Sequence, residues 1–104
     1  MTNPTPPDLE LAGVRALTSL RELTYVSDGH TIRIEVHPRA RTVQISGTVD
    51  PPDATRVQLL VGGVMFAADV DGTGGFVIGG VDHGTVLPFV DLPDGRIRLG
   101  SFEV

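Results

Sequence analysis

The sequence predicts an all-β domain in which two antiparallel sheets pack face to face as a sandwich. Valine dominates the apolar residues, and 13 glycines and 8 prolines divide the chain, which is a composition typical of strands and turns. From position 21 onward apolar and polar residues alternate with a period of two, as they do in half-buried strands. Turn signals separate seven or eight such short runs, and this spacing indicates a sandwich.

The length of 104 residues predicts one domain with a single core. Residues 1–8 hold three prolines, and we interpret them as a disordered or polyproline-like N-terminal arm. Residues 9–20 form a lead-in segment. Its apolar positions recur every third residue, which fits a short helix, whereas Gly13 and the small polar residues favour an extended conformation, so both interpretations stay open. Residues 21–104 form the β-sandwich domain.

Charge and residue usage argue against several classes of function. The net charge is −5 and the arginines are dispersed, whereas a phosphate backbone attracts clustered cations, so we expect no nucleic-acid partner. The absence of cysteine removes disulfides, thiolate metal sites and cysteine nucleophiles. The N-terminus has no signal-peptide pattern, and no apolar run is long enough to span a membrane. We therefore expect a cytoplasmic protein with no membrane partner.

The first three strands are predicted to form an antiparallel meander. Residues 20–27, 30–36 and 42–49 each alternate between apolar and polar positions, and turn signals at 28–30 and 37–41 separate them.

After a break at 50–55, the alternation resumes and continues to the C-terminus. The runs lie on either side of a turn at Gly62 and Gly63, the octapeptide at 69–76, a second break at 79–84 and a turn at 93–95. In the closing stretch, the apolar positions before and after Gly100 are out of phase. Gly100 is therefore predicted to mark a bulge, which would bring the apolar residues before and after it onto the same side of the sheet.

Of all stretches in the chain, the octapeptide DVDGTGGF, residues 69–76, is the strongest candidate for a metal-binding or phosphate-binding loop. Counted from Asp69, an EF-hand loop has Gly80 at position 12, where a bidentate carboxylate is required. A P-loop needs a lysine, which this chain lacks, and a dinucleotide fingerprint needs a helix after it. We therefore expect no metal and no cofactor at this stretch.

The octapeptide is instead interpreted as a structural hairpin turn. Asp71 has a short acceptor that bonds backbone N–H groups two or three residues further on. Gly74 adopts a positive φ, and Phe76 then points into the core.

A longer pattern around this turn resembles the carboxypeptidase regulatory-like group of transthyretin-like sandwiches. The resemblance covers residues 42 to 90 and consists of Ile45, Gly47, Val49 and Pro51, then Val57 and Leu59, then Asp71, Gly74 and Phe76, then Val81, Gly84 and Val86. It implies a Greek-key, transthyretin (prealbumin)-like topology for the seven or eight strands. Transthyretin-like sandwiches as a whole include a hydrolase whose terminal Tyr-Arg-Gly-Ser motif this chain lacks, since it ends GSFEV.

A second, weaker resemblance comes from the opening LTYVSDGHTIRIEV, residues 23–36. It is similar to small actinobacterial proteins encoded beside sigma factors and CHAT-type peptidases. This resemblance implies a regulatory accessory protein whose partner is a sigma factor or a peptidase-linked protein.

The polar residues predict no catalytic site. The 3 histidines, His30, His37 and His83, lie at or beside turns and are interpreted as solvated. The serines have no nearby histidine and acid, and Gly-x-Ser-x-Gly is missing. Carboxylates in turn segments are interpreted as bonding local backbone: Asp50, Asp53, Asp82, Asp91 and Asp94.

Some strands are apolar on both sides, although only one side is needed for the core, and the additional apolar residues predict an interface. They are Leu60, Met65, Val77, Leu87 and Phe89. Either residues 9–20 or another molecule covers them, and the second molecule is a protein partner or another copy of this chain.

We therefore expect a non-enzymatic protein-interaction module that acts as a regulatory or accessory partner and binds through an apolar sheet face or an edge strand. The alternative is a carbohydrate-binding sandwich, which has less support because the chain holds one Tyr, four Phe and no Trp. A second alternative is a small transthyretin-like hydrolase with convergent histidines.

Overall fold

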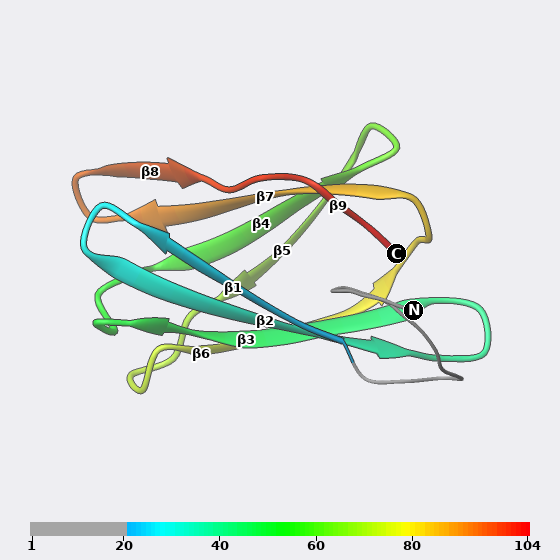
Figure 1. The fold of residues 1–104 in the computed structure, drawn as a ribbon, viewed down its shortest axis with the longest axis horizontal. Coiled ribbons are helices and arrows are strands. Elements are labelled where there is room, and N and C mark those ends of the chain that lie inside the picture. Colours follow the sequence, from blue (N-terminus) through cyan, green and yellow to red (C-terminus); the bar gives the residue numbers. More distant parts are fainter. Residues whose placement is uncertain (1–20) are drawn as a thin grey trace, which may run out of the picture.

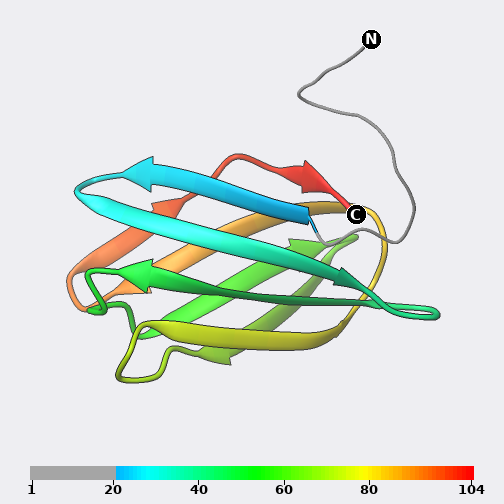
Figure 2. The same cartoon turned by 60° about the horizontal axis from the view of Figure 1, so that its bottom comes forward.

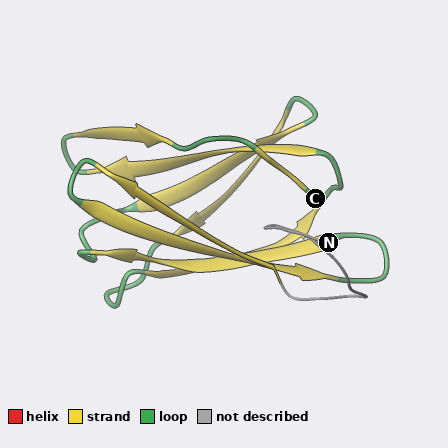
Figure 3. Cartoon of the chain, viewed as in Figure 1, coloured by secondary structure: helices red, strands yellow, loops and turns green. Residues whose placement is uncertain are grey.

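The structure is a computed structural model that describes residues 21–104, so the arm and the lead-in segment lie outside the described residues. This part of the chain contains nine strands and no helix (Figures 1 and 3). The strands are β1 (Arg21–Ser27), β2 (His30–Pro38), β3 (Val43–Asp50), β4 (Arg56–Val61), β5 (Val64–Asp69), β6 (Gly75–Val81), β7 (Thr85–Leu92), β8 (Gly95–Arg98) and β9 (Phe102–Glu103). Between residues 21 and 104, no helix exists that could cross a membrane.

The strands form two antiparallel sheets packed face to face, which confirms the predicted all-β sandwich. Sheet A has the order β1-β2-β3-β6, and sheet B has the order β5-β4-β7-β8, with β9 also paired to β7. Figure 2 shows β1, β2 and β3 side by side in blue, cyan and green, with the strands of sheet B in a second layer. The predicted number of seven to eight strands becomes nine because the closing stretch is divided into β8 and β9.

The predicted meander is confirmed by the pairing of β1 with β2 and of β2 with β3. Asp28 and Gly29 join β1 to β2 with positive φ values of 52° and 77°. A two-residue turn with both φ values positive has the twist that an antiparallel hairpin needs. The Gly62-Gly63 turn between β4 and β5 has the same character, with φ values of 56° and 81°.

One core fills the space between the sheets, because the inward residues of both are apolar. Ile32, Ile34 and Ile45 of sheet A are fully buried, as are Leu59 and Val90 of sheet B. The period of two explains this arrangement, since alternate residues of each strand face the same side.

β6 continues through the glycines that were predicted to break it, so the predicted break at 79–84 begins too early. The strand includes Gly79 and Gly80, and Val81 returns to pair with Val43. The register shifts by one residue here, and Gly80 has a φ of 68°, so the two glycines form a bulge within the strand. The chain leaves the sheet only at Asp82.

The bulge predicted at Gly100 is confirmed. Phe89 pairs with Arg98 and Val86 pairs with Phe102, so three steps along β7 correspond to four along the closing stretch. One extra residue lies between Arg98 and Phe102 on the same side of β7. The shift lets Phe102 face the core although it is out of phase with the residues before it.

The octapeptide 69–76 is a turn, but the prediction of a hairpin is wrong. β5 belongs to sheet B and β6 belongs to sheet A, so the turn connects the two sheets. Gly74 has the predicted positive φ of 86°, and Phe76 is buried as predicted. The N–H of Val49 donates to the carbonyl of Gly74 at 2.8 Å and fastens the turn to β3.

Candidate functional site

The two sheets differ in what they present on their outward sides. The outer face of sheet A is mainly polar, with Thr24, Arg33 and Thr48 in one row across β1, β2 and β3. The outer face of sheet B holds apolar side chains. Its inward side already contributes to the core, so the second apolar side needs a separate explanation.

The outward apolar residues of sheet B form a group that we call the apolar patch: Leu60, Met65, Ala67, Leu87 and Phe89. Leu60 pairs with Met65 on one side and with Leu87 on the other, which makes a continuous row across β5, β4 and β7. In the next row, Gln58 lies between Ala67 and Phe89. Met65 is 46% exposed, and Leu60, Leu87 and Phe89 are partly exposed.

A row of alternating charges borders the apolar patch on sheet B. This charged row consists of Asp69, Arg56, Asp91 and Arg96, which are paired in that order across β5, β4, β7 and β8. Each acid has a base beside it. The Arg56 Nε lies 3.7 Å from Asp69, and the Arg96 Nε lies 2.6 Å from Asp91.

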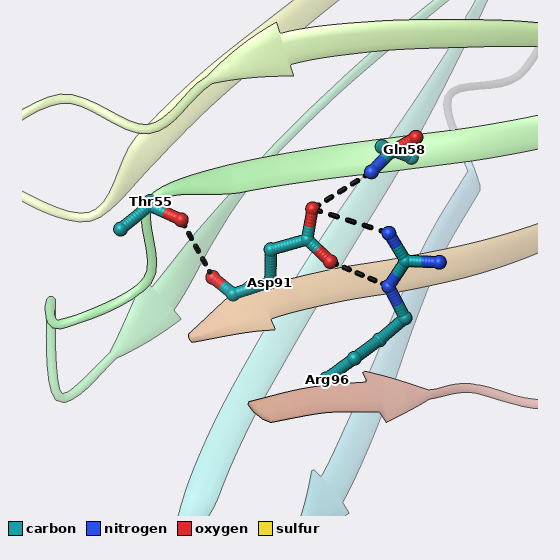
Figure 4. A network of polar contacts seen from close by, with 4 residues as sticks. All are labelled: Thr55, Gln58, Asp91 and Arg96. Carbon is teal, nitrogen blue, oxygen red and sulfur yellow. Dashed lines mark hydrogen bonds and ion pairs between the residues drawn. The ribbon is translucent and has the colours of Figure 1, made fainter. Parts of the chain in front are cut away.

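Asp91 is the centre of a hydrogen-bond network that joins β4, β7 and β8 (Figure 4). Its Oδ1 accepts from Arg96, and its Oδ2 accepts from the Gln58 amide at 2.7 Å. Thr55 donates its backbone N–H at 2.8 Å and its hydroxyl at 3.2 Å to the Asp91 carbonyl. The Arg96 hydrogen bond, with smaller contributions from the Gln58 hydrogen bond and the nearby arginine charges, lowers the pKa of the Asp91 carboxyl, although burial opposes this shift. The interpretation of Asp91 as a turn carboxylate is therefore wrong, because it bridges strands.

Arg96 also connects the charged row to the apolar patch. Its guanidinium lies 5.2 Å from the centre of the Phe89 ring, within the range of a cation–π contact. The hydrogen bonds to Asp91 hold the guanidinium in this position. One residue thus orders an aromatic side chain of the patch and one acid of its border.

The structure brings together four of the five predicted interface residues and separates the fifth. Leu60, Met65, Leu87 and Phe89 share the outer face of sheet B. Val77 lies on edge strand β6 of sheet A, where it pairs with Ser46 of β3 and is 60% exposed. Val77 is therefore not part of the apolar patch.

The octapeptide turn uses its aspartate for local hydrogen bonds, as predicted. The Asp71 carboxylate accepts from the N–H and hydroxyl of Thr73 and from the N–H of Gly75, two and four residues further on. These bonds, led by the Thr73 hydroxyl, lower the pKa of Asp71. Within residues 21–104, no group of three or more His, Asp or Glu side chains has the arrangement of a metal site.

His30 is buried, so its interpretation as a solvated turn histidine is wrong. Its Nδ1 lies 2.9 Å from the Asp28 carbonyl, and its Nε2 lies 2.8 Å from Asp53. Both partners are acceptors, so both ring nitrogens donate only when the imidazole is protonated. The Asp53 bond, followed by the Asp28 bond, raises the pKa of His30. Asp53 thus contacts a distant side chain and joins the β3–β4 connection to the β1–β2 turn.

His37 lies on strand β2 beside a serine and an acid, which sequence spacing did not indicate. Its Nε2 is 3.1 Å from the Ser46 hydroxyl and 3.3 Å from Glu35. In a catalytic triad, the acid contacts the ring nitrogen opposite the one that faces the serine. Here both partners contact the same nitrogen, so the acid does not orient the ring toward the serine.

Among the described residues, a hollow beside Ser46 is lined by acids but by no histidine, and His83 is not part of its lining. This shallow hollow of about 420 Å³ lies beside Glu35 and Ser46 and extends to Asp69 and Asp71. His83 is exposed in the β6–β7 connection, as predicted. His30 and His37 lie seven residues apart on one strand, a separation of about 23 Å at 3.3 Å per residue.

Comparison with protein-family models, with curated proteins and with solved structures gives no match. The function is therefore inferred from the geometry of the described residues.

Alternation in the sequence indicates which strand residues share a side, but it does not indicate which strands are neighbours. For that reason the Asp91 network and the His30–Asp53 contact have no local signal, since their partners lie 33 and 23 residues apart.

Proposed function

We propose that this chain is a non-enzymatic protein-interaction module that binds another protein through the apolar patch of sheet B. The observation that carries this proposal is a sheet that is apolar on both sides. Its inward side forms the core, whereas the outward side leaves Met65 46% exposed. A contiguous apolar surface with a polar border is typical of protein interaction sites.

The composition of the face supports a protein ligand. Met, Phe and Arg side chains are enriched in the centres of protein interfaces, and this face combines Met65, Phe89 and Arg96. The charged row provides the polar rim that gives such an interface its orientation. The sequence resemblance described above adds a regulatory role, with a sigma factor or a peptidase-linked protein as the partner.

The experiment is affinity capture from lysate with three forms of the immobilised chain. Leu87→Lys places a charge in the middle of the apolar row, and Val26→Lys places the same charge on the outer face of sheet A, where Val26 is 78% exposed. We expect the wild type and Val26→Lys to retain the same protein, and Leu87→Lys to retain at least about ten-fold less of it. Equal retention by all three forms, or none above background, would contradict the proposal.

Carbohydrate binding is the alternative, and Phe89 is the residue that bears on it. A sugar stacks on an exposed aromatic face beside polar groups, and Gln58 and Asp91 are close to Phe89. The Arg96 guanidinium lies over the ring and competes for that position. Reproducible binding on a glycan array that is lost with Phe89→Ala would favour this alternative.

A small hydrolase has less support than either binding function. The side chains of Ser46, His37 and Glu35 meet on one sheet face, but both partners of His37 contact its Nε2. This arrangement favours a structural role for His37 in holding β2 to β3.

A further inference from the structure

The four edge strands of the sandwich differ in how they are protected against pairing with another chain. The edges are β1 and β6 in sheet A, and β5 and the β8–β9 stretch in sheet B. An edge strand leaves half of its backbone N–H and C=O groups without a neighbour, so proteins protect edges with charges, bulges, glycines or covering contacts.

Three of the four edges carry such protection. β1 begins with the charged residues Arg21 and Glu22, and it is fastened to sheet B by hydrogen bonds from Arg21 to the Glu103 carbonyl and from Tyr25 to the Gly100 carbonyl. β6 is rich in glycine and has a bulge. The β8–β9 stretch is interrupted by a bulge and carries arginines.

β5 has no bulge, glycine or covering contact in the described structure, and its one charge, Asp69, is at the end of the strand. Residues 64–68 read VMFAA, with no charge, glycine or proline. All six residues of the strand pair with β4 in an unbroken register, so the strand has no bulge. Val64 is 49% exposed and Met65 is 46% exposed, and Ala67 is exposed as well. A regular, uncharged, accessible edge is a template for one more strand.

We propose that β5 pairs with β5 of a second copy of this chain, antiparallel and across a two-fold axis. Opposite residues of an antiparallel pair point to the same face, so a two-fold register centres on one residue. Centred on Phe66, the register pairs Met65 with the partner's Ala67 and Val64 with the partner's Ala68. Every pair in residues 64–68 is then apolar.

Charge repulsion within the strand does not oppose this register, although each copy has a net charge of −5. The acidic residue of the strand, Asp69, is at its end and already has Arg56 beside it. In the antiparallel arrangement the two Asp69 carboxylates lie six residues apart, about 20 Å at 3.4 Å per residue. That separation exceeds the screening length of about 8 Å at physiological salt.

The β5 pairing would enlarge the surface through which the chain is proposed to bind another protein, so its functional role rests on the proposed function. The two copies of sheet B form one continuous sheet of the order β8-β7-β4-β5-β5-β4-β7-β8. In this register Met65 lies beside Ala67 of the second copy, and the row of Leu87, Leu60 and Met65 is followed there by Ala67, Gln58 and Phe89. The two apolar patches thus adjoin, and another protein meets a larger surface. β5 is the element that connects the two patches.

Sedimentation equilibrium of the full chain tests the pairing. We expect the wild type to be a dimer, and the double variant Met65→Lys with Ala67→Lys to weaken dimerisation by at least about ten-fold, because each lysine lies directly opposite a lysine of the other copy. Both positions face outward, so the core is unchanged. Val26→Lys, on edge strand β1, is the matched control and keeps the wild-type dimer.

A mixed sample provides the rescue. A chain with Met65→Glu and Ala67→Glu is equally repulsive toward itself, but mixed with the double lysine variant it places an acid opposite a base in every outward pair. We expect the mixture to form a heterodimer that neither variant forms alone. Hydrogen exchange on the wild type gives a measurement without substitutions: the amides of β5 gain protection as concentration rises, and those of β1 do not.

A wild-type monomer at all concentrations would overturn the pairing, and so would a dimer that the double lysine variant retains. In the first case, β5 is free to pair with an extended segment of a different protein. The affinity capture with Leu87→Lys separates the two proposals, because Leu87 lies on β7, away from the edge. If the wild type is a monomer and Leu87→Lys loses the captured protein, only the proposed function is supported. If the wild type is a dimer and captures no protein, only the β5 pairing is supported.

Discussion

Gly47 occupies an inward position of β3 at which the core leaves no room for a side chain. A Cβ atom built there lies 1.9 Å from the Arg33 carbonyl oxygen and 2.9 Å from Cζ of Phe76. The Phe76 ring fills the space that a side chain at this position would take, because Gly47 and Phe76 are paired across β3 and β6. The glycine is thus part of the packing of the phenylalanine.

We predict that Gly47→Ala destabilises the fold by about 3 kcal/mol, the upper end of the usual range for overpacking. One of the two close contacts is with backbone, which cannot rotate away. The measurement is the free energy of unfolding from a urea titration. Gly79→Ala is the matched control, since nothing lies within 4 Å of its added Cβ. Similar stability of the two variants would show that β3 shifts at little cost.

His30 is the second position whose local chemistry determines stability. A folded-state pKa above the ordinary value of 6.5 means that the folded protein holds the proton more tightly than the unfolded chain does. The stabilisation is fully present below pH 6.5. It is lost as the pH rises through the raised pKa of the folded state, because the neutral ring then has one donor for two acceptors.

We therefore predict that Asp53→Asn destabilises the protein more at pH 5.5 than at pH 8.5. The expected loss at low pH is about 0.5–1 kcal/mol, because Asp53 is half exposed and its ion pair is screened. Urea titrations of both proteins across this pH range measure the difference, with the exposed Asp94→Asn as the control. A difference that is constant with pH would mean that His30 stays neutral in the fold.

The strands themselves were predictable to different degrees. The β1–β2–β3 meander and the bulge at Gly100 were correct, because alternation and phase are properties of a single stretch of sequence. The predicted end of β6 was wrong. Glycines usually interrupt a strand, but here the pairing of β6 with β3 on both sides of Gly79 and Gly80 keeps them within the strand. Tertiary pairing thus overrides the local signal.

The octapeptide shows the same division between local and distant information. Asp71, Gly74 and Phe76 behave as their residue types predict, since the bonds of Asp71 reach only two to four residues along the chain. The turn joins two sheets because β5 pairs with β4 in sheet B, whereas β6 pairs with β3 in sheet A. No residue within the turn carries that information.

Assignment of strands to sheets also decides the candidate surface. The excess of apolar residues was visible in the sequence, but only the sheet order places Leu60, Met65 and Leu87 in one row and Val77 on the opposite layer. The same sheet order makes β5 an edge. Neither the patch nor the edge is a property of one strand.

The two sheets share one core, and this predicts that the molecule unfolds as a unit. The buried cluster contains residues of both sheets, and Tyr25 of edge strand β1 packs against it while its hydroxyl bonds to the Gly100 carbonyl at 2.8 Å. Removing either sheet would expose the inward side of the other, so partial structures lose the burial that stabilises them.

We predict that Tyr25 fluorescence and far-ultraviolet circular dichroism give the same urea midpoint at one protein concentration. Tyr25 is the single tyrosine and the chain has no Trp, so fluorescence reports the β1 edge, whereas circular dichroism reports all strands. If the β5 edges pair, both midpoints rise together with concentration, because dimerisation stabilises the folded state alone. An earlier fluorescence midpoint would show that β1 separates first and that its contacts with the closing stretch do not join the sheets into one cooperative unit.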